Sequence, residues 1–81
     1  MVRVTFYNLL RSKYKINEIT VHPGTIHDII KQILILHPKI DSSDFTSSII
    51  FYKGKPIHYR GFHTFIDDNE TIIITHFVGG G

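Results

Sequence analysis

The sequence predicts an α+β fold in which a mixed sheet of four to five strands carries one main helix on one face. Several segments, beginning with residues 2–7, alternate apolar and polar residues, which is the two-residue period of a half-buried strand. The segment 25–37 instead repeats its apolar residues every three or four positions, which is the period of a helix with one buried stripe. Because no other segment shows that helical period, we expect a single main helix against a single sheet.

The first two strands are expected at residues 2–7 and 16–22. In each strand the apolar residues at every second position share one face. Residues 8–15 between them are polar and basic, so we expect them to form a turn. Pro23 and Gly24 then end the second strand.

The main helix is expected to begin at Thr25 and to stop before Pro38. The Thr25 hydroxyl can accept a hydrogen bond from a free backbone amide, and Asp28 lies near the positive end of the helix macrodipole. The residue before a proline resists helical geometry, so the helix should end at about residue 37. Its apolar stripe consists of Ile26, Ile29, Ile30, Ile33 and Leu34.

The second half of the chain is expected to supply further strands at residues 48–53, 57–59 and 71–77. The segment 41–48 is polar and is expected to be a loop. Pro56 lacks the amide that a central strand needs, so its neighbourhood should lie away from the centre of the sheet. Three consecutive isoleucines in the last strand indicate cover on both sides and therefore a central position.

The predicted order of elements is β-β-α-β-β-β. If the first and last strands are adjacent and central, they run parallel, and the residues after the last strand leave from the end of the sheet. A strand hairpin followed by a crossing helix is the layout of the β-grasp, or ubiquitin-like, fold. We expect one such domain over residues 1–78, followed by a flexible glycine tail at residues 79–81.

Composition excludes several classes of function. The chain has no cysteine, so it has no disulfide framework, thiolate zinc site or thiol nucleophile, and a cytoplasmic location is expected. No apolar run approaches the roughly 20 residues of a membrane span, and polar residues interrupt the first fifteen positions where a signal peptide would lie. The net charge of +2 is too small to indicate nucleic-acid binding.

The histidines and the basic residues are further candidates for a binding site. The pairs His22/His27 and His58/His63 do not have a recognised ligand spacing, so we expect no metal site. The segment 52–62 interleaves aromatic and basic residues, as single-strand nucleic-acid binders do. Its Arg-Gly-Phe run opens like an RNA-binding motif, but the match fails at His63, so a solvated basic turn without nucleic acid is expected.

The sequence ends on Gly79-Gly80-Gly81. Glycine has no side chain to pack, and it lets a chain pass through gaps too narrow for a Cβ. A free α-carboxylate with a pKa near 3.5 is anionic at neutral pH, so it must be activated before it can react. No phosphate-binding loop or thiol in this chain can activate it. By itself, the glycine run fits an inert linker better than a reactive thread.

Four segments resemble, in order, the small subunit of molybdopterin synthase (MoaD). Residues 2–11, Val-Arg-Val-Thr-Phe-Tyr-Asn-Leu-Leu-Arg, resemble its opening strand, and residues 20–26 resemble its second strand and the start of its helix. Residues 52–57, Tyr-Lys-Gly-Lys-Pro-Ile, resemble a turn of the family, and residues 67–70 resemble the acidic turn before its last strand. The chain is also similar to the thiamine sulfur carrier ThiS and to eukaryotic ubiquitin-related sulfur carriers.

The resemblance implies a sulfur carrier that is not an enzyme on its own and binds no cofactor. An E1-like adenylyltransferase of the MoeB/ThiF type would use ATP to adenylylate the Gly81 carboxylate, and a sulfur donor would convert the adenylate to a thiocarboxylate. The tail would then enter a synthase large subunit of the MoaE type and deliver sulfur for molybdopterin. Gly79 and Gly80 would provide the clearance for this entry.

Docking to such partners requires a surface, and the sheet face away from the helix is the candidate. Phe77 and Tyr7 are expected on or near it, with Tyr52 or Tyr59 nearby. Three other aromatic residues are expected in the core: Phe6, Phe51 and Phe65.

Two other classes of function stay open. One is a ubiquitin-like modifier, which would use the same activation and end in an isopeptide bond between Gly81 and a lysine; a carrier for thiamine or tRNA thiolation is related to it. The other is a β-grasp module that binds nucleic acid or protein and has an inert tail. The C-terminal end of this chain also departs from the family that it resembles. Thr75 and His76 stand where that family has two prolines, and three glycines stand where it has two.

Overall fold

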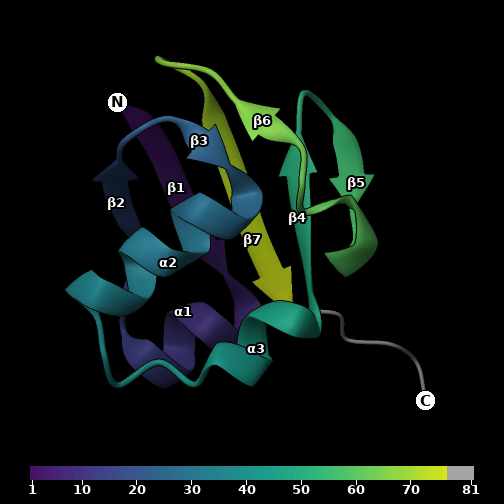
Figure 1. Cartoon of the computed structure of the whole chain (residues 1–81). Helices are drawn as coiled ribbons and strands as arrows, with labels where there is room; N and C mark the ends of the chain where they lie inside the picture. The colour runs from purple at the N-terminus through teal and green to yellow at the C-terminus, as the bar shows by residue number, and fades with distance from the viewer. Residues whose placement is uncertain (77–81) are drawn as a thin grey trace.

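The structure is a computed structural model that describes residues 1–76, apart from the side chains of residues 8–10 and 76. A sheet with the strand order β2-β1-β7-β4-β5 forms one layer, and α2 crosses one of its faces (Figure 1). A second, two-stranded sheet joins β3 and β6. The elements are β1 (Val2–Tyr7), α1 (Asn8–Tyr14), β2 (Glu18–Val21), β3 (Gly24–Thr25), α2 (Ile26–Leu36), α3 (Ser42–Thr46), β4 (Ser48–Tyr52), β5 (Lys55–Ile57), the 3-10 helix η1 (Tyr59–Gly61), β6 (Phe65–Ile66) and β7 (Thr71–His76).

Strands β1 and β7 run parallel at the centre of the sheet, as the sequence predicts. Strand β2 pairs antiparallel with β1, and β4 pairs antiparallel with β7. Pro56 lies in β5 at the edge of the sheet, which confirms that it is kept from the centre. Lys53 and Gly54 both have positive φ and form the tight turn between β4 and β5.

The core lies between the sheet and α2. In β1, the buried residues alternate with exposed or half-buried ones, and the register sets Val4 beside Ile72 and Phe6 beside Ile74. Each isoleucine side chain removed from water contributes roughly 1.5–3 kcal/mol. The contribution of α2 to this core is Ile26, Ile29, Ile30 and Ile33.

Helix α2 begins with a full capping box, as predicted. The Thr25 hydroxyl accepts a hydrogen bond from the Asp28 amide at 3.1 Å, and the Asp28 carboxylate accepts one from the Thr25 amide at 3.1 Å. The hydrogen bond from the Thr25 backbone is the main cause that lowers the pKa of Asp28. The helix ends at Leu36, shortly before Pro38.

Two predicted irregular segments are in fact helices. Residues 8–15, predicted as a turn, contain α1, and residues 41–48, predicted as a loop, contain α3. Both helices are short and are held by contacts with distant parts of the chain, which a local period does not reveal. Lys15 ends α1 in the left-handed conformation. The second strand is shorter than predicted, the fourth lies two residues earlier, and the β3–β6 pair was not predicted.

The aromatic core also differs from the prediction. Phe6 is buried as predicted, but Phe51 is 36% exposed and Phe65 is 57% exposed. Phe45 of α3 and Phe62 after η1 are buried in their place. Phe51 lies outside the core because it directly follows buried Ile50, and successive strand residues point to opposite faces.

Candidate partner-binding face and tail root

The site begins where β7 ends. Strand β7 is paired on both sides, by β1 and by β4, and its last residue His76 has Ser48 as its Cα partner. We call this end of β7, together with the start of β4, the tail root. The predicted site residues Phe77, Gly79, Gly80 and Gly81 lie outside the described residues.

Two short helices flank the tail root. Helix α1 follows β1 and contacts β7, and α3 is separated from β4 by one residue, Ser47. In Figure 1 both helices lie at the same end of the sheet as the end of β7. The start of β4 therefore depends on how α3 is held.

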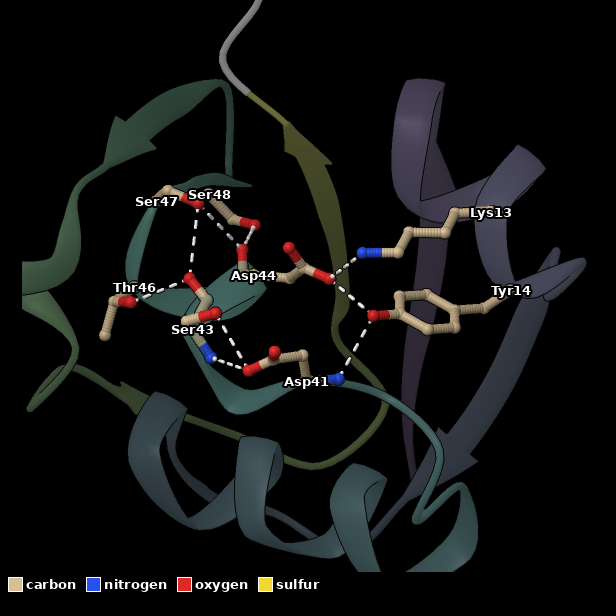
Figure 2. A network of polar contacts seen from close by, with 8 residues as sticks. All are labelled: Lys13, Tyr14, Asp41, Ser43, Asp44, Thr46, Ser47 and Ser48. Carbon is tan, nitrogen blue, oxygen red and sulfur yellow. Dashed lines mark hydrogen bonds and ion pairs between the residues drawn. The ribbon is translucent and has the colours of Figure 1, made fainter.

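A polar network holds α3 against α1 (Figure 2). The Tyr14 hydroxyl donates a hydrogen bond to the Asp44 carboxylate and accepts one from the Asp41 amide at 3.1 Å. The Lys13 ammonium lies 3.1 Å from the same Asp44 carboxylate, which raises the pKa of Lys13. These contacts join residues about 30 positions apart in the sequence. The network therefore links the segment between β1 and β2 to the segment before β4.

The network continues into β4. The Asp41 carboxylate caps α3 by accepting hydrogen bonds from the Ser43 amide at 3.0 Å and the Ser43 hydroxyl at 2.8 Å. These bonds, the backbone one first, lower the pKa of Asp41. The buried hydroxyl of Ser48 donates to the Asp44 carbonyl. Because Ser48 is the partner of His76, the network reaches the tail root itself.

The sheet face away from α2 carries a patch of apolar and small polar side chains. In the central strands every second residue is buried against α2, so the residues between them face the opposite side of the sheet. The strand register then shows which of these residues are neighbours. Ile73 lies between Thr5 and Phe51, and Thr75 lies between Tyr7 and Ile49. We call this surface the open face and define it by these residues: Thr5, Tyr7, Ile49, Phe51, Ile73 and Thr75.

The predicted docking residues are not all on one surface. Tyr7 is exposed on the open face, whereas Tyr52 is the partner of buried Ile72 and packs half-buried on the covered side. Tyr59 also lies on the covered side, where its ring makes an edge contact with His27 at 5.7 Å. Tyr59 and Ser48 both line a hollow of about 460 Å³. Tyr59 therefore lies near the tail root, on the α2 side of the sheet.

Sequence reasoning missed Ile49, Phe51 and Ile73 as open-face residues. The signal was present, because strand alternation places them opposite Ile50, Ile72 and Ile74. Among the side chains that the structure describes, no set of three histidines or carboxylates is arranged to hold a metal ion. No helix in that part of the chain is both long and apolar enough to cross a bilayer.

Comparison with known proteins identifies the architecture. The solution structure of the small archaeal modifier protein 1 (SAMP1) from Methanosarcina acetivorans matches with a TM-score of 0.79 and 22% identity, covering 99% of this chain and 95% of that one. The crystal structure of SAMP1 from Haloferax volcanii matches with a TM-score of 0.76 and 12% identity, covering 99% and 98%. The fold is the ubiquitin-like β-grasp. No family model matches the sequence, and no curated protein gives a significant match.

Proposed function

We propose that this protein is a ubiquitin-like modifier and sulfur carrier that acts through the Gly81 carboxylate. The observation that carries the proposal is the position of β7, a central strand whose last residue, His76, lies at one end of the sheet, five residues before Gly81 in the sequence. The likeness to two solved structures named as modifier proteins supports it. The protein is a carrier and cosubstrate in this proposal, and its partners supply the catalysis.

Both activities share a first step. The Gly81 carboxylate attacks the α-phosphorus of ATP in an adenylyltransferase of the MoeB/ThiF type, releases pyrophosphate and becomes an acyl-adenylate. A lysine amine of a target then displaces AMP, loses a proton and forms an isopeptide bond. Alternatively, the persulfide of a sulfur donor displaces AMP to form an acyl disulfide. A thiol then attacks the donor's sulfur, which releases the thiocarboxylate and leaves a disulfide between that thiol and the donor.

The open face is the proposed docking surface for these partners. Its centre is apolar, with Ile73 beside Phe51, and Thr5 and Thr75 add small polar groups around it. An apolar centre with a polar rim is the usual composition of a specific protein interface. The tail root lies at one end of this face, so a partner that covers the face can receive the glycine run in its active site.

The experiment combines the protein with ATP, a cognate activating enzyme and a sulfur donor, and measures intact mass. A gain of about 16 Da, from exchange of one oxygen for sulfur, supports the carrier activity, and adducts the size of a second protein support the modifier activity. A chain whose Gly81 carboxylate is blocked as an amide is the control and should give neither product. No change in mass with several activating enzymes refutes the proposal.

The docking surface is tested with a matched pair of variants. Ile73→Asp places a charge at the centre of the open face, and Phe65→Asp places one at an exposed phenylalanine elsewhere. We expect the first to raise the KM of the activating enzyme for this protein at least tenfold and the second to leave it within twofold, because a central interface charge loses its hydration. Equal effects of the two variants refute the open face as the docking surface.

A second candidate is a role in molybdopterin synthesis. The resemblance of residues 2–11 to the small subunit of molybdopterin synthase favours this pathway over other sulfur-transfer pathways. The test adds a MoaE-type large subunit and a pterin precursor to the thiocarboxylated protein. Transfer of sulfur to the pterin, with return of the protein to its starting mass, supports this role, and a thiocarboxylate that persists contradicts it.

A further inference from the structure

The hollow beside the tail root has the character of a site for an anion. It has a volume of about 460 Å³ and is lined by residues 46–49, from the start of β4, and by residues 58–60, from the start of η1. This volume falls in the range of roughly 300–1,000 Å³ that is typical of sites for small ligands. None of the lining residues is acidic, and two of them, His58 and Arg60, can carry a positive charge.

Carboxylates are absent from the segments around the hollow. The sequence contains no aspartate or glutamate between Asp44 and Asp67. Asp44 itself directs its carboxylate toward Lys13 and Tyr14 of α1. Among the residues that the structure describes, none forms an ion pair with Arg60, whose side chain is exposed. The guanidinium of Arg60 is therefore available to an anion.

Hydroxyl groups also line the hollow, but their hydrogens are used within α3. The Thr46 hydroxyl donates to the Ser43 carbonyl at 2.8 Å, and the Ser48 hydroxyl donates to the Asp44 carbonyl. The serine between them bonds to carbonyls of the same helix. Arg60 is then the main donor that a ligand can use. Its planar guanidinium matches the two oxygens of a carboxylate.

The C-terminal carboxylate of the same chain is close enough to reach this site. His76 is the Cα partner of Ser48, which lines the hollow. Strands β5 and β7 both run antiparallel to β4, so both end on this side of the sheet, and His58 directly follows β5 (Figure 1). Two strand spacings, about 10 Å, separate β5 from β7. The five residues 77–81 can span up to about 17 Å.

Attachment to the same chain favours this carboxylate over a free anion. An exposed ion pair is weak, so a free carboxylate would bind only at high concentration. A carboxylate joined by a short linker has an effective concentration in the millimolar range. If the dissociation constant is equal to this concentration or about a third of it, the site is filled about half to three quarters of the time. The last three residues are glycines, so no Cβ limits the approach.

We propose that this hollow is a binding site for the α-carboxylate of the chain's own Gly81, which Arg60 binds with His58 beside it. The site takes the terminus when no partner holds it. Conversion of the carboxylate to an isopeptide removes its negative charge and releases it from Arg60. The proposal concerns the same carboxylate as the proposed function, but it needs no ATP, activating enzyme or sulfur donor. Either one can therefore fail without the other.

The first test measures the pKa of the Gly81 carboxyl in the full 81-residue chain, from the pH dependence of its carbonyl chemical shift. An ion pair that is filled half to three quarters of the time lowers this pKa by about 0.3–0.6 from its ordinary value near 3.5. Arg60→Gln should return the pKa to about 3.5. Lys55→Gln removes an equal charge from an exposed position of β5 outside the hollow and should change the pKa by less than about 0.1.

The second test is made at neutral pH and leaves the sequence unchanged. Amidation of the Gly81 carboxyl removes its charge. Besides the tail itself, it should shift the Arg60 side-chain Nε–H resonance and the amides of residues 46–49 and 58–60, and dilution should leave these shifts unchanged. Four results would overturn the proposal: the same Gly81 pKa in the parent and Arg60→Gln, equal effects of Arg60→Gln and Lys55→Gln, amide shifts centred on Ile73, or shifts that depend on protein concentration, which would place the carboxylate on a second copy.

Discussion

Substituting Tyr14 by phenylalanine removes one oxygen atom from the network between α1 and α3. That oxygen donates to the Asp44 carboxylate and accepts from the Asp41 amide. A neutral hydrogen bond contributes about 1 kcal/mol net and one to a charged group about 1.5–3 kcal/mol. Tyr14 is half-buried. We therefore expect a loss of about 2 kcal/mol in the free energy of unfolding, or about 10 °C in Tm for a domain of this size.

The loss is measured by urea unfolding and by calorimetry, with Tyr7→Phe as the matched control. Tyr7 is exposed on the open face, so its substitution should change the free energy of unfolding by less than about 0.5 kcal/mol. Hydrogen exchange adds a local readout, since Tyr14→Phe should speed exchange of the Ser48 amide more than that of the Ile29 amide. If Tyr14→Phe and Tyr7→Phe have equal effects, the network does not support the tail root.

Three further predictions concern the helices and pH. Thr25→Ala should cost about 1 kcal/mol in urea unfolding because it removes the cap of α2, and a cost near zero would contradict the capping box. Phe45→Ala should cost about 3–5 kcal/mol by calorimetry, whereas a loop at residues 41–48 would lose less than about 1 kcal/mol. Hydrogen bonds from Thr25 and Ser43 hold the pKa values of Asp28 and Asp41 below 3.8, so their stabilisation is present above pH 3.8 and is lost as pH falls through the lower folded values. Acid titration of an Asp28→Asn variant, which has no carboxyl group to titrate at this position, should show a smaller loss than the parent, and equal losses would contradict the assignment to Asp28.

The main helix and the central strand could be predicted because their signals are local. Thr25 and Asp28 form a cap within one turn, and the apolar stripe that follows lies within a helix of 11 residues. The three isoleucines at positions 72–74 predicted a central strand, and β7 does lie between β1 and β4, although only Ile72 and Ile74 are buried and Ile73 is on the open face. In both cases each residue of the pattern supports the same element, so tertiary contacts did not change the outcome.

The two short helices could not be predicted by period because what holds them is distant in sequence. Helix α3 has five residues and buries one aromatic, Phe45, so it shows no repeat. Its support comes from Tyr14, about 30 positions earlier. Asp41 was a local signal for its start, since aspartate before two serines is a typical N-cap sequence. The exposure of Phe51 could also have been predicted, because Phe51 directly follows buried Ile50 in one strand and successive strand residues point to opposite faces.

The parallel pairing of β1 and β7 has a mechanical consequence. Their directions put residue 1 and residue 76 at opposite ends of the sheet, so a pull between the two ends of the described chain acts along both strands. The hydrogen bonds that join β7 to β1 and to β4 then carry the load together, in shear, and do not open one after another. Cargo attached beyond His76 would be tethered to a strand that shares tension with neighbours on both sides.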